Sequence, residues 1–221
     1  MASTITLSAD TIDDLIYDAR SGDLAALKED LTACSAQFPD VSLGAVVAAA
    51  IDAAPEAEGG SGSSLLHFPA ANGNIEILTY LLTLLATEES TRRRIVNHRN
   101  HSGNTPLHWA ALNTHLDCVK ALVEAGADSS VKNDAGLDPV FLAERADWST
   151  QEEGGAAAAE AEAEAEAEAE ADANAAADPG KMSKGRQVVE WMLSAEVAAA
   201  GGDSETVVAS AGVPVTGNGD E

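Results

Sequence analysis

The sequence predicts an all-α solenoid of about four repeats, each made of two antiparallel helices with a β-turn tip beside them. The main observation is internal repetition: residues 63–82 and 104–128 align through a Leu-His pair, neighbouring Ala residues and a second apolar segment. Residues 15–31 fit the same frame, with Gly22 aligned to Gly73. In each second segment, apolar residues recur at helical spacing on one face. Repetition of such helix pairs predicts a stacked array with a continuous core.

The third repeat contains the sequence TPLHWAA over residues 105–111. Thr105 is a suitable N-cap, and Pro106 suits the first helical position because it lacks the amide hydrogen that would have no partner there. Leu107 and the two Ala residues that follow are expected to face neighbouring helices. The pattern TPLHxA is typical of ankyrin repeats. The chain is therefore identified as a member of the ankyrin-repeat family.

We place the ankyrin repeats within residues 1–147, at about 11–31, 63–85, 104–128 and 133–147. The last repeat begins with Asp138-Pro139 in place of Thr-Pro but lacks a second helix where one is expected. An acidic Ala/Glu-rich stretch, 148–182, follows, and the apolar pattern of a second helix returns at 183–198. We predict that the acidic stretch is an insertion that splits this capping repeat. Repulsion between glutamates four residues apart predicts disorder or a frayed helix there, and residues 199–221 resemble a disordered tail.

The spacing between repeats is irregular, so we expect long loops at 33–62 and 87–102, with an extra helix at 43–53. Pro69 lies inside a predicted first helix and should kink it. Thr114 replaces the glycine of the turn between paired helices, so Asn113 or Thr114 must take a strained turn conformation.

The charge excludes direct nucleic-acid binding, because 12 basic residues against 37 acidic ones give a net charge of −25. No apolar run is long enough to cross a bilayer, and the start resembles no secretion signal. Cys34 and Cys118 lack the spacing of a zinc site or a disulfide framework. We expect a soluble protein of the cytoplasm and nucleus that does not contact membranes.

No nucleophile, base and orienting acid occur at informative spacing, and there is no glycine-rich phosphate loop. We therefore predict no enzymatic activity, no cofactor and no metal. His67 and His108 are interpreted as structural hydrogen-bonding residues rather than catalysts. His98 and His101 are interpreted as loop histidines, although metal binding is the alternative. Residues 92–94, three arginines, fit a solvated loop, a partner for the acidic insertion, or a nuclear-import or ligand patch.

Stacked ankyrin repeats present a concave face made of the tips and the exposed residues of each first helix. Trp109 is the most informative residue there, because large half-exposed rings are favoured binding anchors. The alternative is that it fills a gap beside small Ala neighbours. The predicted partner-binding residues are Tyr17, Arg20, Ser21, Phe68, Ala71, Asn72, His101, Ser102, Asn104, Trp109, Leu112, Asn113, Asp134, Leu142 and Arg145.

Five features together resemble the fungal ankyrin-repeat chaperones dedicated to a small-subunit ribosomal protein. They are DDLIYDARSGDLAALK, LLHFPAANGNIEILTYLL, a lengthened loop ending in GNTPLHWA, VKNDAGLDPVFLAERA and the acidic C-terminal region. The resemblance covers about residues 11–147 and resumes near 185–193; Pro69 and the long Ala/Glu insertion depart from it.

This resemblance implies an ATP-independent chaperone that binds the newly made third protein of the small-subunit series, which contains a KH domain. The chaperone would bind a basic, helical N-terminal segment, keep the client soluble, meet the nuclear import machinery through it and deliver it to pre-ribosomes. The acidic residues suit a basic client. Those expected to shield it are Glu160, Glu162, Glu164, Glu166, Glu168 and Glu170. The alternatives are an ankyrin adaptor that regulates a transcription factor or kinase, and an enzyme subunit.

Overall fold

The structure, a computed structural model, describes residues 5–152 and 182–200, which form ten α-helices and one short 3-10 helix. Within these residues there is no strand, and one isolated β-bridge joins Ile51 to Ser64. The prediction of an all-α array is confirmed. The helices are α1 (Ala9–Ser21), α2 (Leu24–Ala36), α3 (Leu43–Ala49), α4 (His67–Asn72), α5 (Ile75–Leu85), α6 (Glu89–Val96), α7 (Pro106–Leu112), α8 (Leu116–Glu124), α9 (Pro139–Glu152) and α10 (Lys184–Ala200), with the 3-10 helix at Glu56–Glu58.

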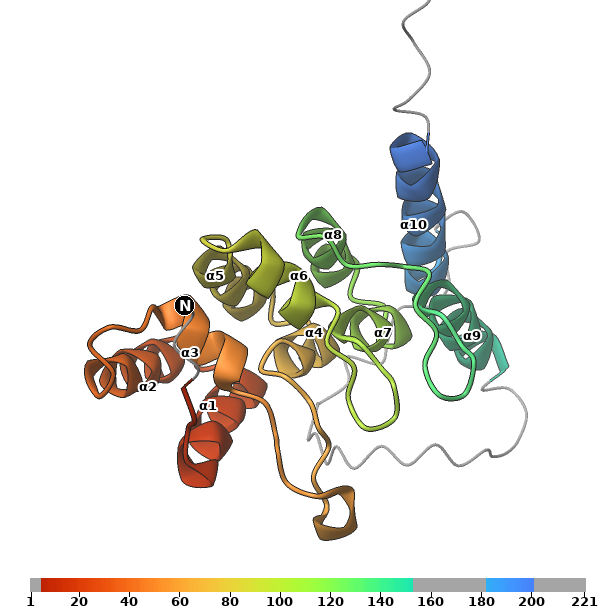
Figure 1. The fold of residues 1–221 in the computed structure, drawn as a ribbon. Helices are drawn as coiled ribbons and strands as arrows, with labels where there is room; N and C mark the ends of the chain where they lie inside the picture. The colour runs from red at the N-terminus through yellow and green to blue at the C-terminus, as the bar shows by residue number, and fades with distance from the viewer. Residues whose placement is uncertain (1–4, 153–181, 201–221) are drawn as a thin grey trace, which may run out of the picture.

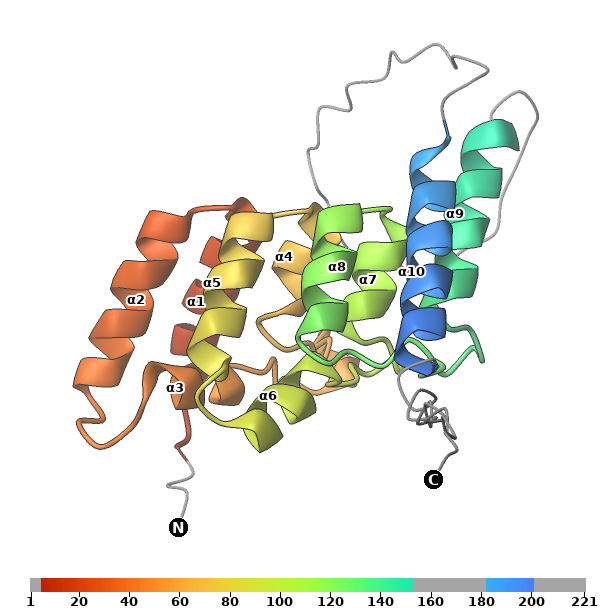
Figure 2. The ribbon, with the colours of Figure 1, turned by 90° about the horizontal axis from the view of Figure 1, so that it is seen from above.

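The helices form two rows of antiparallel pairs (Figures 1 and 2). The first helices α1, α4, α7 and α9 pack side by side in one row, in that order. In the other row, α5 packs on α8 and α8 on α10, while α3 contacts both α2 and α5. Fully buried leucines from both rows, such as Leu15, Leu27, Leu78, Leu107 and Leu122, fill the space between them. Each row hides its apolar side against the other, as in other repeat arrays.

Side-chain caps and left-handed turns set where the helices start and stop. Ser8 accepts a hydrogen bond from the amide of Thr11 at the start of α1, and Asp23 accepts from two amides of α2. Glycine occupies the left-handed position after α1 and α4. After α7, Thr114 takes this position with φ 57°, which confirms the strained turn predicted there.

Pro69 does not disrupt its helix, because it is only the third residue of α4. Amides in the first turn have no acceptor within the helix, so proline removes no hydrogen bond there. The helix continues through Pro69 to Asn72. Pro69 therefore breaks no hydrogen bond within α4, and the loss that would have produced the predicted kink does not occur.

Both inserted segments contain a helix, although only one was predicted. The extra helix expected at 43–53 is α3, capped by Ser42. Residues 87–102 were expected to form a loop but contain α6, and this is a correction. Its physical basis is a buried side formed by Ile95 and Val96, together with Glu89 in the first turn and Arg93 in the last, which complement the helix dipole.

The last helix pair combines two segments that are distant in the sequence. α10 packs along α9 and also touches α8, so it completes the second row (Figure 2). Val188 and Met192 are its buried side chains, with 0% and 1% exposure. The acidic insertion was predicted at 148–182 and the tail at 199–221. Of these, residues 148–152 belong to α9 and residues 199–200 to α10, whereas residues 153–181, with Glu160 to Glu170, and residues 201–221 lie outside the described residues.

Candidate partner-binding face

The tips of successive repeats are joined by backbone hydrogen bonds. The amide of His101 donates to the carbonyl of Ser61 at 2.9 Å, and the amide of Asp134 donates to that of Ser102 at 3.1 Å. Arg99 adds an ion pair with Asp134 at 2.8 Å. The tips therefore form a continuous ladder beside the first helices. His101, Ser102 and Asp134, which were predicted to bind a partner, are exposed members of it.

Two buried histidines link the first helices α4 and α7 to the tip that follows each of them. The Nδ1 atom of His67 accepts from the amide of Ser64 at 3.1 Å, so Nε2 carries the proton and donates to the Asn104 carbonyl at 3.0 Å. His108 repeats this arrangement: Nδ1 accepts from the Thr105 amide at 3.1 Å, and Nε2 lies 3.2 Å from the next tip, at the Leu137 carbonyl. Each ring thereby accepts a hydrogen bond from an amide at the start of its own helix and donates one to a carbonyl of the neighbouring repeat.

Burial keeps these two imidazoles neutral. Desolvation lowers the pKa of His67 from 6.5 to about 4, with a smaller contribution from nearby His98, and it also lowers the pKa of His108. Neither ring is accessible to a substrate, because both are 0% exposed. The structural interpretation of His67 and His108 is therefore confirmed.

At the opposite end of the first helices, asparagine side chains hold neighbouring repeats together. The Asn72 amide group donates to the Arg20 carbonyl at 2.9 Å. Asn113 donates to the Ala71 carbonyl at 3.0 Å, and the Nε2 atom of His115 reaches the same oxygen at 2.9 Å. Asn72 and Asn113 were predicted as partner-binding residues and are exposed. However, their side-chain amides already donate hydrogen bonds to backbone carbonyls of the preceding repeat.

Apolar side chains lie along the first helices between these two ends. We call this the first-helix face, defined by Tyr17, Phe68, Trp109 and Leu112. Tyr17 is 71% exposed and Leu112 is 44% exposed, while Phe68 and Trp109 are half-buried. The Trp109 ring meets His67 and Phe68 edge to face, with centroids 5.8 Å and 6.3 Å apart. Trp109 thus packs against its neighbours in the array and also keeps exposed surface. The first feature fits the interpretation as a gap-filling residue, and the second fits the interpretation as a binding anchor.

Leu142 is a correction to the predicted face, because it is only 6% exposed. Phe141, its neighbour in α9, is 39% exposed. Successive helical residues point about 100° apart, so the orientation of α9 turns Phe141 rather than Leu142 outward. The sequence alignment matched Leu142 to Trp109, but an alignment does not determine how α9 is rotated about its own axis. Arg145 is exposed, as predicted.

Trp148 was also missed, and it is 57% exposed. The repeat predicted from the sequence ends at residue 147, whereas α9 continues to Glu152. In the sequence, the only indication of this exposed residue was a large aromatic side chain just beyond the end of the predicted repeat.

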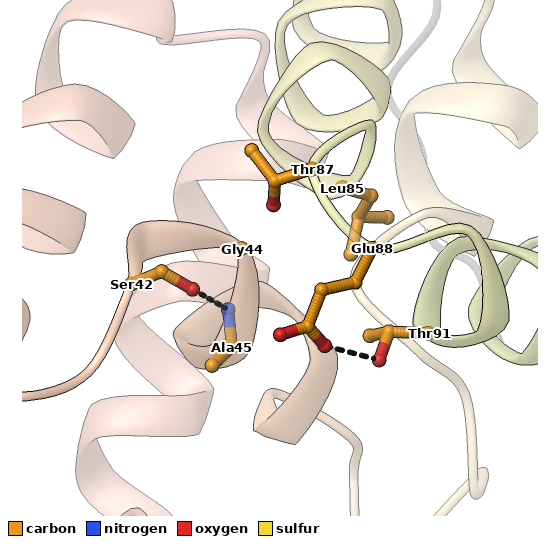
Figure 3. Close-up of a pocket in the computed structure, with 7 residues that line it drawn as sticks. All are labelled: Ser42, Gly44, Ala45, Leu85, Thr87, Glu88 and Thr91. Carbon is orange, nitrogen blue, oxygen red and sulfur yellow. Dashed lines mark hydrogen bonds between the residues drawn. The ribbon is translucent and has the colours of Figure 1, made fainter. Parts of the chain in front are cut away.

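A hollow elsewhere in the described residues is a weak candidate site. The hollow between α3 and the α5–α6 junction, lined by residues such as Ser42, Leu85 and Glu88, has a volume of about 10 Å³ (Figure 3). This is the space of about one water molecule. Three of its polar side chains already have partners: Ser42 caps α3, and Thr91 donates to Glu88 at 3.0 Å.

Metal and thiol chemistry also lack a site in the part of the chain that the structure describes. No three metal-ligating side chains gather there. The rings of His98 and His101 bond the carbonyls of Gly62 and Gly60, both at 2.9 Å, which favours the loop interpretation. Cys118 is buried, and desolvation raises the pKa of its thiol to about 11. Among these residues, no helix is long and apolar enough to span a membrane.

Comparison with known proteins gives a family and several relatives. Residues 16–133 match the family described as Ankyrin repeats (3 copies). The Ankyrin repeat-containing protein YAR1 of Saccharomyces cerevisiae is 32% identical over 137 residues, which are 61% of this chain and 62% of that protein. Human NF-kappa-B inhibitor zeta is 36% identical over 86 residues, 37% of this chain and 11% of that protein. The chain thus spans less than two thirds of the length of these relatives.

A solved structure extends this similarity. One chain in the crystal structure of the yeast ribosomal protein Rps3 in complex with its chaperone Yar1 matches with a TM-score of 0.54 and 34% sequence identity. The match covers 66% of this chain and 91% of that chain. The ankyrin-repeat prediction and the resemblance to ribosomal-protein chaperones are both confirmed.

Proposed function

The chain belongs to the ankyrin-repeat family, and we propose that it is a non-enzymatic, ATP-independent chaperone for the ribosomal protein equivalent to yeast Rps3. The observation that carries this proposal is the match, in both sequence and structure, to the complex of Rps3 with its chaperone. The proposed binding site is the first-helix face together with the ladder of tips.

The chemistry of this face suits a basic amphipathic helix. The rings of Tyr17, Phe68 and Trp109, with Leu112, supply apolar anchors, while the net charge of −25 attracts a basic client. Acidic side chains stand in for the RNA phosphates that the client meets later, so they suppress nonspecific contacts with RNA. We propose that Glu160 to Glu170 contribute to this shielding.

Delivery to pre-ribosomes in the nucleus is the proposed consequence of such binding. The chaperone would capture the client in the cytoplasm, keep it soluble and reach the nuclear import machinery through the client. In this proposal none of these steps needs a bound nucleotide.

Co-purification and calorimetry test the proposal. Rps3 should co-purify with the tagged chain from yeast, and the purified proteins should bind in the absence of ATP. Trp109→Ala should weaken the affinity by about 2 kcal/mol, the usual scale for an anchor. Leu193→Ala is a matched control, because Leu193 is 48% exposed on α10, in the other row.

Two outcomes would contradict the proposal. Without enrichment of Rps3, and with a transcription factor or kinase recovered instead, the adaptor alternative would replace it. If folded Trp109→Ala bound Rps3 with unchanged affinity, the client would not use the first-helix face.

A further inference from the structure

The first repeat carries an open hollow at the turn between α1 and α2, at the end of the array that Figure 1 shows in red. Its volume is about 610 Å³. One wall is Tyr17, which occupies in α1 the repeat position that Phe68 and Trp109 occupy in α4 and α7. The hollow is therefore continuous with the first-helix face. Its lining residues are Tyr17, Asp18, Ser21, Gly22, Asp23 and Ala26.

Asp18 is the unusual residue of this hollow. Its side chain is only 7% exposed, and within the described residues its Oδ2 atom has no hydrogen-bond partner. Burial raises the pKa of this carboxyl to about 6, and the charge of Asp30, a side-chain hydrogen bond with Asp30, and the charges of Asp23 and Asp14 add to the effect. A buried carboxyl oxygen without a partner is costly in free energy, so the fold alone gives no reason for an acid here.

Among the neighbouring side chains, the carboxyl of Asp30 bonds with that of Asp18, but two carboxyl groups share a hydrogen only while one of them is protonated, so no cation or permanent donor is supplied. The Ser21 hydroxyl donates to the backbone carbonyl of Asp18 at 3.1 Å, not to its carboxyl group. Asp23 accepts hydrogen bonds from the first amides of α2, and Asp30 is itself an acceptor when ionised. Lys28 of α2 lies over the Tyr80 ring, 4.9 Å from its centre.

We propose that this hollow binds a cationic side chain, arginine or lysine, of the basic client. A guanidinium or ammonium group would donate to Asp18, and its charge would balance Asp23 and Asp30. The exposed ring of Tyr17 offers a cation–π surface at the entrance. A metal ion fits less well, because no group of three metal-ligating side chains exists in the described residues. The inference rests on the proposed function, since it assigns the client's cation to a place on the same face.

The first test replaces Asp18 with the isosteric amide. Calorimetry with yeast Rps3 should show that Asp18→Asn binds about tenfold more weakly or worse, because a hydrogen bond to a charged group is lost. Asp13→Asn is the matched control: Asp13 is an exposed acid of the same helix, and its replacement should change the affinity less than twofold. Thermal unfolding of Asp18→Asn should show no loss of stability, which separates binding from folding.

The second test identifies the client residue that enters the hollow. Each arginine and lysine of the client's N-terminal segment is changed to alanine and measured against both chaperones. One replacement should weaken binding to the original chain at least tenfold and have little effect on binding to Asp18→Asn.

Three results would overturn the inference. One is unchanged affinity for Asp18→Asn while Trp109→Ala weakens binding, which would leave the proposed function intact. Another is a client scan in which each basic-residue replacement weakens binding to the original chain and to Asp18→Asn by the same factor. The third is a thermal shift produced by Mg²⁺ or Ca²⁺ in the original chain and absent in Asp18→Asn, which would assign the hollow to a metal. Unchanged affinity for both Asp18→Asn and Trp109→Ala would instead refute the proposed function.

Discussion

Replacing His67 with phenylalanine should remove one of the connections between the second and third repeats. Phenylalanine keeps a planar ring against Trp109 but has no ring nitrogens. The amide of Ser64 and the carbonyl of Asn104 would then lose their buried partners, which lie 3.1 Å and 3.0 Å from the imidazole. Each unsatisfied buried group costs about 1–3 kcal/mol. We therefore expect a loss of about 2–6 kcal/mol in the free energy of unfolding at pH 7.

The cost of this substitution should depend on pH. The imidazole of His67 has its pKa lowered from 6.5 to about 4 by burial, so the folded state binds fewer protons than the unfolded state between these values. Its contribution to stability is complete above pH 6.5 and is lost as the pH falls through about 4. At 1.36 kcal/mol per pH unit, this loss reaches at most about 3 kcal/mol. The variant lacks the titrating group, so its deficit relative to the original chain should shrink at low pH.

Urea unfolding at pH 7, 5.5 and 4.5 measures this difference. Leu66→Ala is the matched control, because Leu66 is fully buried next to His67 and has no titrating group. Its deficit of about 2–5 kcal/mol should stay constant over the same pH range. If the deficit for His67→Phe were equally constant, folding would not lower the pKa of His67, and this prediction would be refuted.

Three further substitutions test other parts of the structure by urea unfolding. Thr114→Gly should stabilise the array by about 1 kcal/mol, because glycine accepts the left-handed turn at φ 57° without strain; no gain would mean that the turn is not strained. Met192→Ala should cost about 2–5 kcal/mol, whereas Leu193→Ala should cost about 0.5 kcal/mol or less; equal costs would show that α10 does not pack as described. Asp18→Asn should be more stable than the original chain at pH 7 by at most about 3 kcal/mol, and this gain should disappear below about pH 4, since the raised pKa of Asp18 penalises the folded state only as the pH rises through about 6.

Features encoded by short motifs could be predicted from the sequence. The Thr105-Pro106 start and the hydrogen bond from the Thr105 amide to His108 involve residues within one turn, so local chemistry determines them. The strain at Thr114 followed in the same way from its alignment with a glycine. Apolar residues near 43–53 also predicted α3, because its buried side lies within the segment itself.

Features that depend on packing between distant segments could not be predicted. α6 contains three successive arginines, which favoured a loop, and its helix depends on burying Ile95 and Val96 against other elements. The exposure of Phe141 rather than Leu142 depends on how α9 is rotated. The burial of Asp18 arises only when α1 pairs with α2 and brings Asp30 near it.

The connections between repeats explain how the face could select a partner. The first helices α4 and α7 are tied together at both ends, by His67 near the tips and by Asn113 at the other end. Asn72 also ties α4 to α1, and His108 ties α7 to the tip before α9. The rings between these ends are therefore held at fixed spacing before any partner arrives, which lowers the entropy cost of binding. Charge, by contrast, acts over about 8–10 Å at physiological salt and mainly speeds the encounter. It follows that rings such as Trp109 should determine how slowly a partner leaves, while the acidic surface determines how quickly it arrives.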